Sequence, residues 1–250
     1  MKRLMILAVV VVTIAGLVAW STGQAPLRPA LQVEVAERNP WTHLRVNRND
    51  EEFQFVIVSD RTGGHRPKVF SRAVELINLL QPAFVVSVGD LIEGYTEKLD
   101  QLQAEWREFD SFVHRLQMPF FYVPGNHDYS NPLQERLWKE KFGRPYYHFL
   151  YQDVLFLMVN SDDPPKTSEG HISKEQIEYF RRVLEGNPRV CWTLVFLHRP
   201  LWATQKVAET GWLEFEQLLT DRPYTVFAGH VHRYKRFVRC LLYTSDAADE

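Results

Sequence analysis

The sequence predicts an α/β layered sandwich, in which helices cover the outer faces of the sheets. Two observations predict this class. From Glu51 onward, short strand-like runs alternate with longer amphipathic runs of helical spacing. In the middle of this region, two strand-like runs follow each other closely enough to form a hairpin. Strands that alternate with helices are typical of sheets with helical cover.

Five strand-like runs share one feature, which is that a short polar cluster lies just after each of them. Their β-branched and aromatic residues favour strands. In chain order these runs cover residues 53–59, 84–88, 120–123, 193–197 and 224–228. Two further runs, 146–150 and 154–159, are separated by Gln152 and Asp153, which predicts a hairpin turn.

Helical spacing of apolar residues predicts three helices in the same region. The first covers residues 69–80 and stops before Pro82, which cannot continue a helix. The second covers residues 99–116, where apolar side chains share one side. Residues 173–176 match a capping box, so a third helix is expected to begin there and to stop at Gly186.

The N-terminus has the pattern of an export signal. Lys2 and Arg3 precede an apolar run over residues 4–20. The run is near the minimum that spans a bilayer, roughly 17 residues, so residues 1–22 are expected to be either a cleaved signal peptide or a membrane anchor. We therefore expect an exported protein, periplasmic or extracellular. Residues 23–50 are expected to form a linker that could include an edge strand.

The C-terminus carries a segment that does not resemble the rest of the chain. Residues 240–250 look like the translation of a transposase-type sequencing-library adapter. We expect this segment to be a cloning or assembly artefact, the alternative being a genuine acidic tail. On that interpretation the folded domain covers residues 51–239 and lacks its natural C-terminus.

Composition excludes some classes of function. The formal net charge is −2 and stays near neutral when both ends are left out, which argues against a specific nucleic-acid-binding surface. Cys191 lies in an apolar run, where a lone thiol is expected to be a buried, inert core residue. No disulfide framework is expected. The sequence does not indicate an oligomeric state.

The polar residues after the five strand-like runs form the candidate site. They are Asp60, Asp90, Asn126-His127-Asp128, His198, and His230 with His232. Because the carboxyl ends of parallel strands lie at one edge of a sheet, we expect these side chains to converge. Any single aspartate could simply cap a helix, and a lone histidine is usually a hydrogen-bonded core residue. Together their oxygen and nitrogen donors suit hard or borderline divalent cations.

The ordered motifs resemble those of the calcineurin-like metallophosphoesterase superfamily. The resemblance covers about residues 53–232 and rests on four blocks, which are Gly89-Asp90, Gly125-Asn126-His127-Asp128, His198 before Arg199-Pro200, and Gly229-His230-Val231-His232. It implies a four-layer α/β/β/α sandwich. It also implies a metal-dependent phosphoesterase that hydrolyses a phosphate mono- or diester by attack of a metal-bridging hydroxide.

The resemblance assigns a role to each candidate residue. It implies two divalent metal ions, drawn from Mn, Fe, Zn or Mg. One ion would be held by Asp60, Asp90 and His232, and the other by Asp90, Asn126, His198 and His230. His127 would act as a general acid or phosphate-binding group, and Asp128 would orient it.

The first block departs from the family pattern. The family usually has Asp-x-His there, but Thr62 stands at the place of the histidine. Either His65 reaches the metal, helped by the flexible Gly63-Gly64, or the first metal has fewer protein ligands. Arg61 could contact the phosphate or lie on the surface. The departure also leaves open a different class of protein, a non-catalytic phosphate- or partner-binding module on a degenerate fold. The sequence does not name the substrate.

Overall fold

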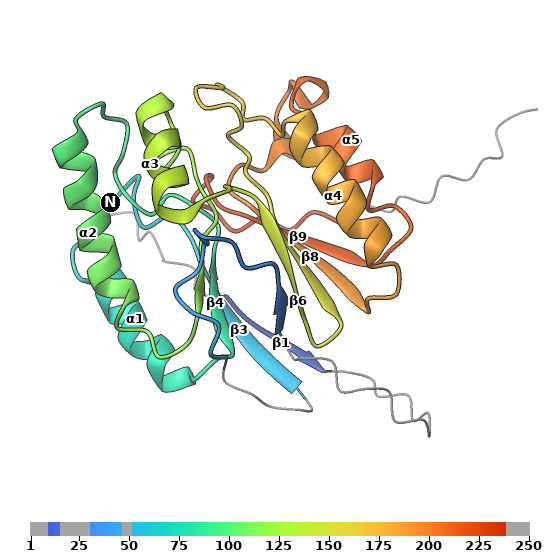
Figure 1. Cartoon of the computed structure of the whole chain (residues 1–250), viewed down its shortest axis with the longest axis horizontal. Coiled ribbons are helices and arrows are strands. Elements are labelled where there is room, and N and C mark those ends of the chain that lie inside the picture. The colour runs from blue at the N-terminus through green and yellow to red at the C-terminus, as the bar shows by residue number, and fades with distance from the viewer. Residues whose placement is uncertain (1–9, 16–30, 47–51, 239–250) are drawn as a thin grey trace, which may run out of the picture.

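Two β-sheets face each other, and helices cover the outer face of each, as Figure 1 shows. The structure is a computed structural model that describes residues 10–15, 31–46 and 52–238. The first sheet has the strand order β1-β3-β4-β5, and the second has the order β2-β6-β7-β8-β9. Helices α1, α2 and α3 lie on one side and α4 and α5 on the other. The predicted four-layer α/β/β/α sandwich is confirmed.

Most strands of each sheet run parallel to a neighbour. The first sheet consists of β1 (Val10–Ala15), β3 (Glu52–Val58), β4 (Phe84–Ser87) and β5 (Phe120–Phe121). In it β3 and β5 run parallel to β4, whereas β1 is antiparallel to β3. The second sheet consists of β2 (Leu31–Val33), β6 (Tyr147–Tyr151), β7 (Val154–Met158), β8 (Trp192–Leu197) and β9 (Tyr224–Ala228). In it β7, β8 and β9 are parallel.

The predicted hairpin and helices are present, with two additions. Gln152 and Asp153 join β6 to β7 with φ angles of 46° and 61°, as a tight hairpin turn requires. The helices are α1 (Val69–Leu80), α2 (Leu99–Val113), α3 (Pro132–Phe142), α4 (Lys174–Gly186) and α5 (Trp212–Gln217), with short 3-10 helices at Leu201–Ala203 and Val207–Glu209. Ser173 caps α4 through the Gln176 N–H, as predicted. Neither α3 nor α5 was predicted.

Buried apolar side chains form three clusters, which fill the spaces between the four layers of secondary structure. Strand β4 shows how one strand serves two of them, since alternate side chains point to opposite faces. Phe84 and Val86 point between the two sheets, and Val85 faces the helices. Phe84 makes edge-to-face contacts with Phe156 and Phe149 of the second sheet at 5.3 and 5.5 Å between ring centroids. This central layer fixes how the two sheets face each other.

Some predictions on the chain ends lie partly outside the described residues. Within the apolar run 4–20, Val10–Ala15 forms β1, and residues 240–250 are not described. In the described part of the chain, no helix is long and apolar enough to cross a membrane. Three expectations therefore stay predictions. They are that the protein is exported, that residues 1–22 form a signal peptide or an anchor, and that residues 240–250 are an artefact. The expected edge strand in the linker is present as β2.

The prediction for Cys191 is wrong. The residue is exposed and lies just before β8, in the connection that follows α4. The apolar run includes Cys191, but burial starts only at Thr193, the second residue of β8.

We expect Phe84→Ala to destabilise the protein by about 3–5 kcal/mol, because it removes a fully buried ring between the sheets. Urea unfolding followed by circular dichroism measures this. The matched control is Leu79→Ala on α1, where the side chain is 80% exposed and the change should stay within roughly 0.5 kcal/mol. An equal loss of unfolding free energy in the two variants would contradict the claim that Phe84 holds the two sheets together.

Candidate metal centre

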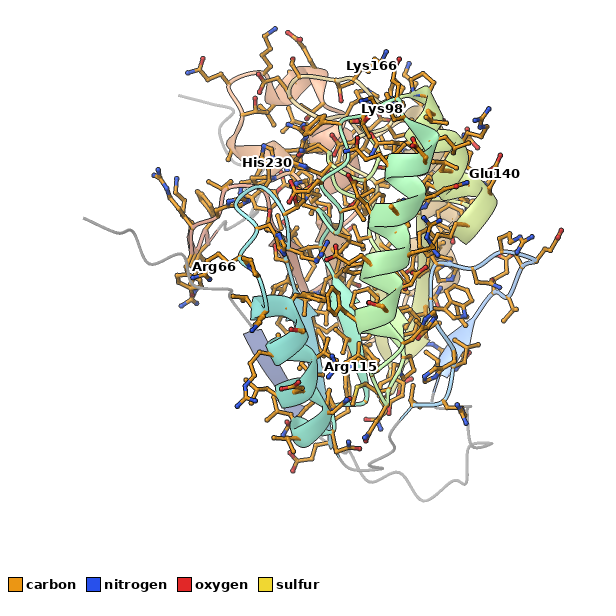
Figure 2. All side chains as sticks on the ribbon, turned by 90° about the vertical axis from the view of Figure 1, so that its left-hand side faces the viewer. Arg66, Lys98, Arg115, Glu140, Lys166 and His230 are labelled. Atoms are coloured by element: carbon orange, nitrogen blue, oxygen red, sulfur yellow. The ribbon has the colours of Figure 1, made fainter. Side chains whose placement is uncertain are left out.

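The candidate residues gather at the carboxyl ends of the parallel strands. Asp60 follows β3, Asp90 follows β4, and the stretch Asn126-His127-Asp128 follows β5. His198 follows β8, while His230 and His232 follow β9. Figure 2 shows His230 at the same end of the molecule as Lys98, which precedes α2, and away from Arg115, which follows it. The predicted convergence is therefore present in the structure.

The first donor group surrounds one nitrogen of His198. Its Nε2 lies 3.1 Å from Oδ2 of Asp90, 3.0 Å from Oδ1 of Asn126 and 3.3 Å from Nδ1 of His230. One donor atom from each of Asp90, His198 and His230 lies within 4.8 Å of the others. Together with Asn126, these are the four residues that the resemblance assigned to one metal.

The second donor group shares Asp90 with the first. It contains Asp60, Asp90 and His232, whose donor atoms again lie within 4.8 Å of one another. The Nε2 atom of His232 is 3.1 Å from Oδ1 of Asp60. Because Asp90 belongs to both groups, its carboxylate is placed where a bridging ligand would be needed.

The charges of the first group are tightly coupled. Burial alone would raise the pKa of Asp90, but His198 and the N–H group of His127 lower that pKa to about 2. Burial alone would lower the pKa of His198. The attraction of the Asp90 carboxylate outweighs the effect of burial and raises the pKa of His198 to about 9. Burial and the positive His198 lower the pKa of His230 to about 4. Without metal, the site therefore holds an ionised Asp90 against a protonated His198.

The backbone fixes which nitrogen of His198 faces the other donors. Its Nδ1 lies 2.8 Å from the carbonyl oxygen of Val88, which can only accept a hydrogen bond. The Nδ1 atom therefore carries a proton, and Nε2 is the nitrogen that can offer a lone pair to a metal. The His198 side chain is fully buried, so this orientation is rigid.

Four of the candidate ligands sit on strained backbone. Asp60, Asp90, His230 and His232 have φ angles of 48°, 59°, 70° and 50°. Residues other than glycine rarely adopt such angles, and each costs about 1–3 kcal/mol. The folded chain tolerates this cost at four positions of one cluster, which is the distribution expected of a functional site.

Two glycines let the loops after β4 and β5 touch. A Cβ atom on Gly89 would lie 2.7 Å from the backbone of Gly125, and a Cβ atom on Gly125 would lie 2.3 Å from Oδ1 of Asp90. No other residue type fits at these positions without moving the loops. The close approach of the loops brings Asp90 within reach of Asn126.

Asp128 has a different role from the one predicted. Its buried carboxylate accepts hydrogen bonds from the N–H groups of Asp90 and Gly125, both at 2.8 Å, and from those of Leu91 and Ile92. It therefore ties the two loops together rather than orienting the His127 ring. Burial and the nearby Asp90 raise the pKa of Asp128, and these N–H donors oppose that shift.

The His127 ring is oriented by a backbone carbonyl instead. Its Nδ1 lies 2.6 Å from the oxygen of Glu93, and its Nε2 lies 3.9 Å from Oδ2 of Asp90. Since the carbonyl can only accept, Nδ1 carries a proton and Nε2 is the nitrogen that faces the two donor groups. The N–H group of His127 also donates to Oδ1 of Asp90 at 3.0 Å.

The unusual first block supplies no further ligand from His65. That residue is exposed and belongs to neither donor group. Thr62 is buried, and its hydroxyl has no hydrogen-bond partner in the described part of the chain. Arg61 is not a surface residue, because it is buried and pairs with Glu108 of α2. The second donor group thus consists of Asp60, Asp90 and His232.

Two residues near the site were not singled out from the sequence. Tyr95 accepts a hydrogen bond from Nδ2 of Asn126 at 2.6 Å, and its ring meets that of His127. Arg199 places Nη1 at 3.4 Å from Nε2 of His230 and is held by buried Asp162 at 2.8 Å. Tyr95 lies in a connection without a chemical motif, five residues after Asp90. Arg199 directly follows His198 in the block His198-Arg199-Pro200, in which only the histidine had been given a role.

Comparison with known proteins agrees with this geometry. Residues 53–234 match the family described as calcineurin-like phosphoesterases, and the chain belongs to this family. A 3',5'-cyclic adenosine monophosphate phosphodiesterase, CpdA, from Haemophilus influenzae is 24% identical over 160 residues, which are 60% of this chain and 54% of that protein. CpdA from Escherichia coli K12 is 24% identical over 156 residues, with the same coverage. The chain thus spans about half the length of these curated relatives.

A solved structure supports the fold. The crystal structure of a dimetal phosphatase from Danio rerio aligns with a TM-score of 0.53 at 15% sequence identity. The alignment covers 71% of this chain and 81% of the zebrafish chain. At this identity the likeness concerns the arrangement of sheets and helices.

The donors fit a divalent metal centre. They combine carboxylate, amide and imidazole groups and include no thiolate, a set that suits Mg, Mn, Fe and Zn. The fixed Nδ1 of His198 leaves its Nε2 free for a metal, as in imidazole ligands oriented by a carbonyl. The strained backbone of four ligands favours the same assignment. Family and geometry together favour a divalent metal centre at this edge of the fold.

We expect Gly125→Ala to abolish stable metal binding, because the new Cβ would lie 2.3 and 2.4 Å from Oδ1 and N of Asp90. Metal per chain after dialysis against Mn²⁺ measures this. Gly186→Ala is the matched control, since its Cβ meets nothing within 4 Å and should leave metal content unchanged. Full metal content in Gly125→Ala would contradict the placement of Asp90.

Metal affinity should rise with pH. Because the pKa of His198 is raised to about 9, its imidazole is protonated near neutrality, and a metal must displace that proton. His230, with a pKa of about 4, is already neutral and adds no proton. Affinity for Mn²⁺ should therefore increase about tenfold per pH unit between pH 6.5 and 8, as calorimetric titration can measure. A constant affinity over this range would contradict the assignment of His198 as a ligand.

Proposed function

We propose that this protein is a metal-dependent phosphoesterase that uses two divalent ions. The observation that carries the proposal is the pair of donor groups that share Asp90. Asp60, Asp90 and His232 would hold one ion, and Asp90, Asn126, His198 and His230 the other. Mn, Fe, Zn and Mg all suit such mixed ligands.

The bound ions would activate a water molecule as nucleophile and neutralise charge on the phosphate oxygens. The chain's own residues provide the other requirements. Asp60 is fixed by the N–H group of His230 at 2.8 Å and by the hydroxyl of Ser59. Asp128 holds the loops that carry Asp90 and His127 at a fixed distance. The ligands are thus in place before any substrate binds.

His127 is the residue that we propose as general acid or phosphate-binding group. Its Nδ1 is held by Glu93, so Nε2 faces the donor groups and can carry a proton for the leaving oxygen. The packing of Gly94 against the His127 carbonyl oxygen leaves little freedom for this segment, since a Cβ on Gly94 would lie 1.7 Å from that oxygen. Fixed orientation is what proton transfer to a leaving group requires.

The substrate class is a phosphate mono- or diester. Two findings support this range. The curated relatives carry the name of a cyclic nucleotide phosphodiesterase, and the structural neighbour carries that of a phosphatase. The donor groups themselves fit either ester, because both present non-bridging oxygens to the ions.

The test is hydrolysis of p-nitrophenyl phosphate and of its bis ester in Mn²⁺. We expect His127→Ala to lower kcat by about 10²–10⁴-fold while metal content is kept, because only proton transfer or phosphate binding is lost. Asp90→Asn should lose both metal and activity. His114→Ala, at the exposed end of α2, is the control and should behave as wild type.

Two results would count against the enzyme. Turnover that persists in His127→Ala and Asp90→Asn would place the chemistry elsewhere. Phosphate binding without turnover of either ester, across several metals, would favour a phosphate-binding module on the same fold.

A further inference from the structure

We propose that Tyr95 is a positioning residue of the metal centre, whose hydroxyl sets the orientation of the Asn126 amide. The inference rests on the proposed function, because it takes Asn126 as a metal ligand. Tyr95 lies in the connection between β4 and α2, which carries no recognisable motif. Its role follows from the contacts that it makes with two residues of the site.

The first contact orients Asn126. Nδ2 of Asn126 donates a hydrogen bond to the hydroxyl of Tyr95 at 2.6 Å, and Oδ1 of the same amide lies 3.0 Å from Nε2 of His198. An amide has one oxygen and one nitrogen, and only the oxygen can bind a cation. By engaging the nitrogen, Tyr95 keeps the oxygen turned toward the donor group.

The second contact involves His127. The ring centroids of Tyr95 and His127 are 4.5 Å apart and meet edge to face at 67°. The preceding residues hold the same histidine, since Glu93 contacts its Nδ1 and Gly94 packs against its carbonyl oxygen. Tyr95 thus touches both the proposed ligand and the proposed acid.

The backbone of Tyr95 is held in a costly conformation. Its φ angle is 51°, which a bulky side chain rarely adopts, and the side chain is 59% exposed. Burial of the ring in the core therefore does not account for this conformation. Neighbouring bonds maintain it, because the Gly94 N–H donates to Glu105 at 2.9 Å and Asn131 donates to the Thr96 carbonyl at 3.2 Å. In this backbone conformation the hydroxyl of Tyr95 lies within hydrogen-bond distance of the Asn126 amide.

The experiment measures Mn²⁺ affinity by calorimetric titration, without substrate. We expect Tyr95→Phe, which keeps the ring and removes the hydroxyl, to weaken binding by about 10- to 100-fold, as is typical when the partner of a metal ligand is lost. The matched control is Tyr179→Phe, which also removes a hydrogen-bonded hydroxyl, 2.7 Å from Nδ1 of His148. That variant should bind Mn²⁺ as wild type does.

A second background separates orientation from general damage to the loop. In Asn126→Asp both terminal atoms of the side chain are oxygens. Either oxygen can bind the metal, so no hydrogen-bond partner is needed to turn an oxygen toward it. We therefore expect Tyr95→Phe to have no further effect on Mn²⁺ affinity when combined with Asn126→Asp. A merely structural role for Tyr95 would give the same loss in both backgrounds.

The outcomes distinguish this inference from the proposed function. A loss of affinity in Tyr95→Phe that disappears with Asn126→Asp supports the inference. Wild-type affinity in Tyr95→Phe, or an equal loss in both backgrounds, overturns it and leaves the phosphoesterase intact. Failure of the wild-type protein to bind Mn²⁺ would overturn both.

Discussion

The hydrogen bonds to the Asp128 carboxylate are the constraint on which the site depends. A single buried side chain accepts from the loop after β4 and from the loop after β5, at Asp90 and Gly125. Glycine at positions 89 and 125 allows the loops to come this close. Together with the hydrogen bond from the His127 N–H group to Asp90, this link holds Asp90 beside the loop that carries Asn126.

The layered fold supplies the other side of the centre. Parallel strands β8 and β9 bring His198, His230 and His232 to the edge where β3 and β4 end. The aromatic layer between the sheets, with Phe84 against Phe149 and Phe156, holds these edges in register. Packing energy from the core thus offsets the strained backbone of the four candidate ligands.

Much of this arrangement could be predicted from the sequence, because it depends on local patterns. The period of apolar residues gave the bounds of α1, and strand ends located Asp60, Asp90 and His198. The hydrogen-bond and ion-pair partners of a side chain could not be predicted in this way, because they depend on loops that meet only after folding. The pairing of Arg61 with Glu108 and the link from Asp128 to the loops are such cases. Tyr95 was missed for the same reason.

The most direct test of the metal centre is a crystal grown with Mn²⁺ and measured for anomalous scattering. Two peaks are expected, one bounded by Asp60, Asp90 and His232 and the other by the group around His198. Both peaks should contact Asp90. A map without a peak at Asp90, in crystals that show the same fold, would contradict the account.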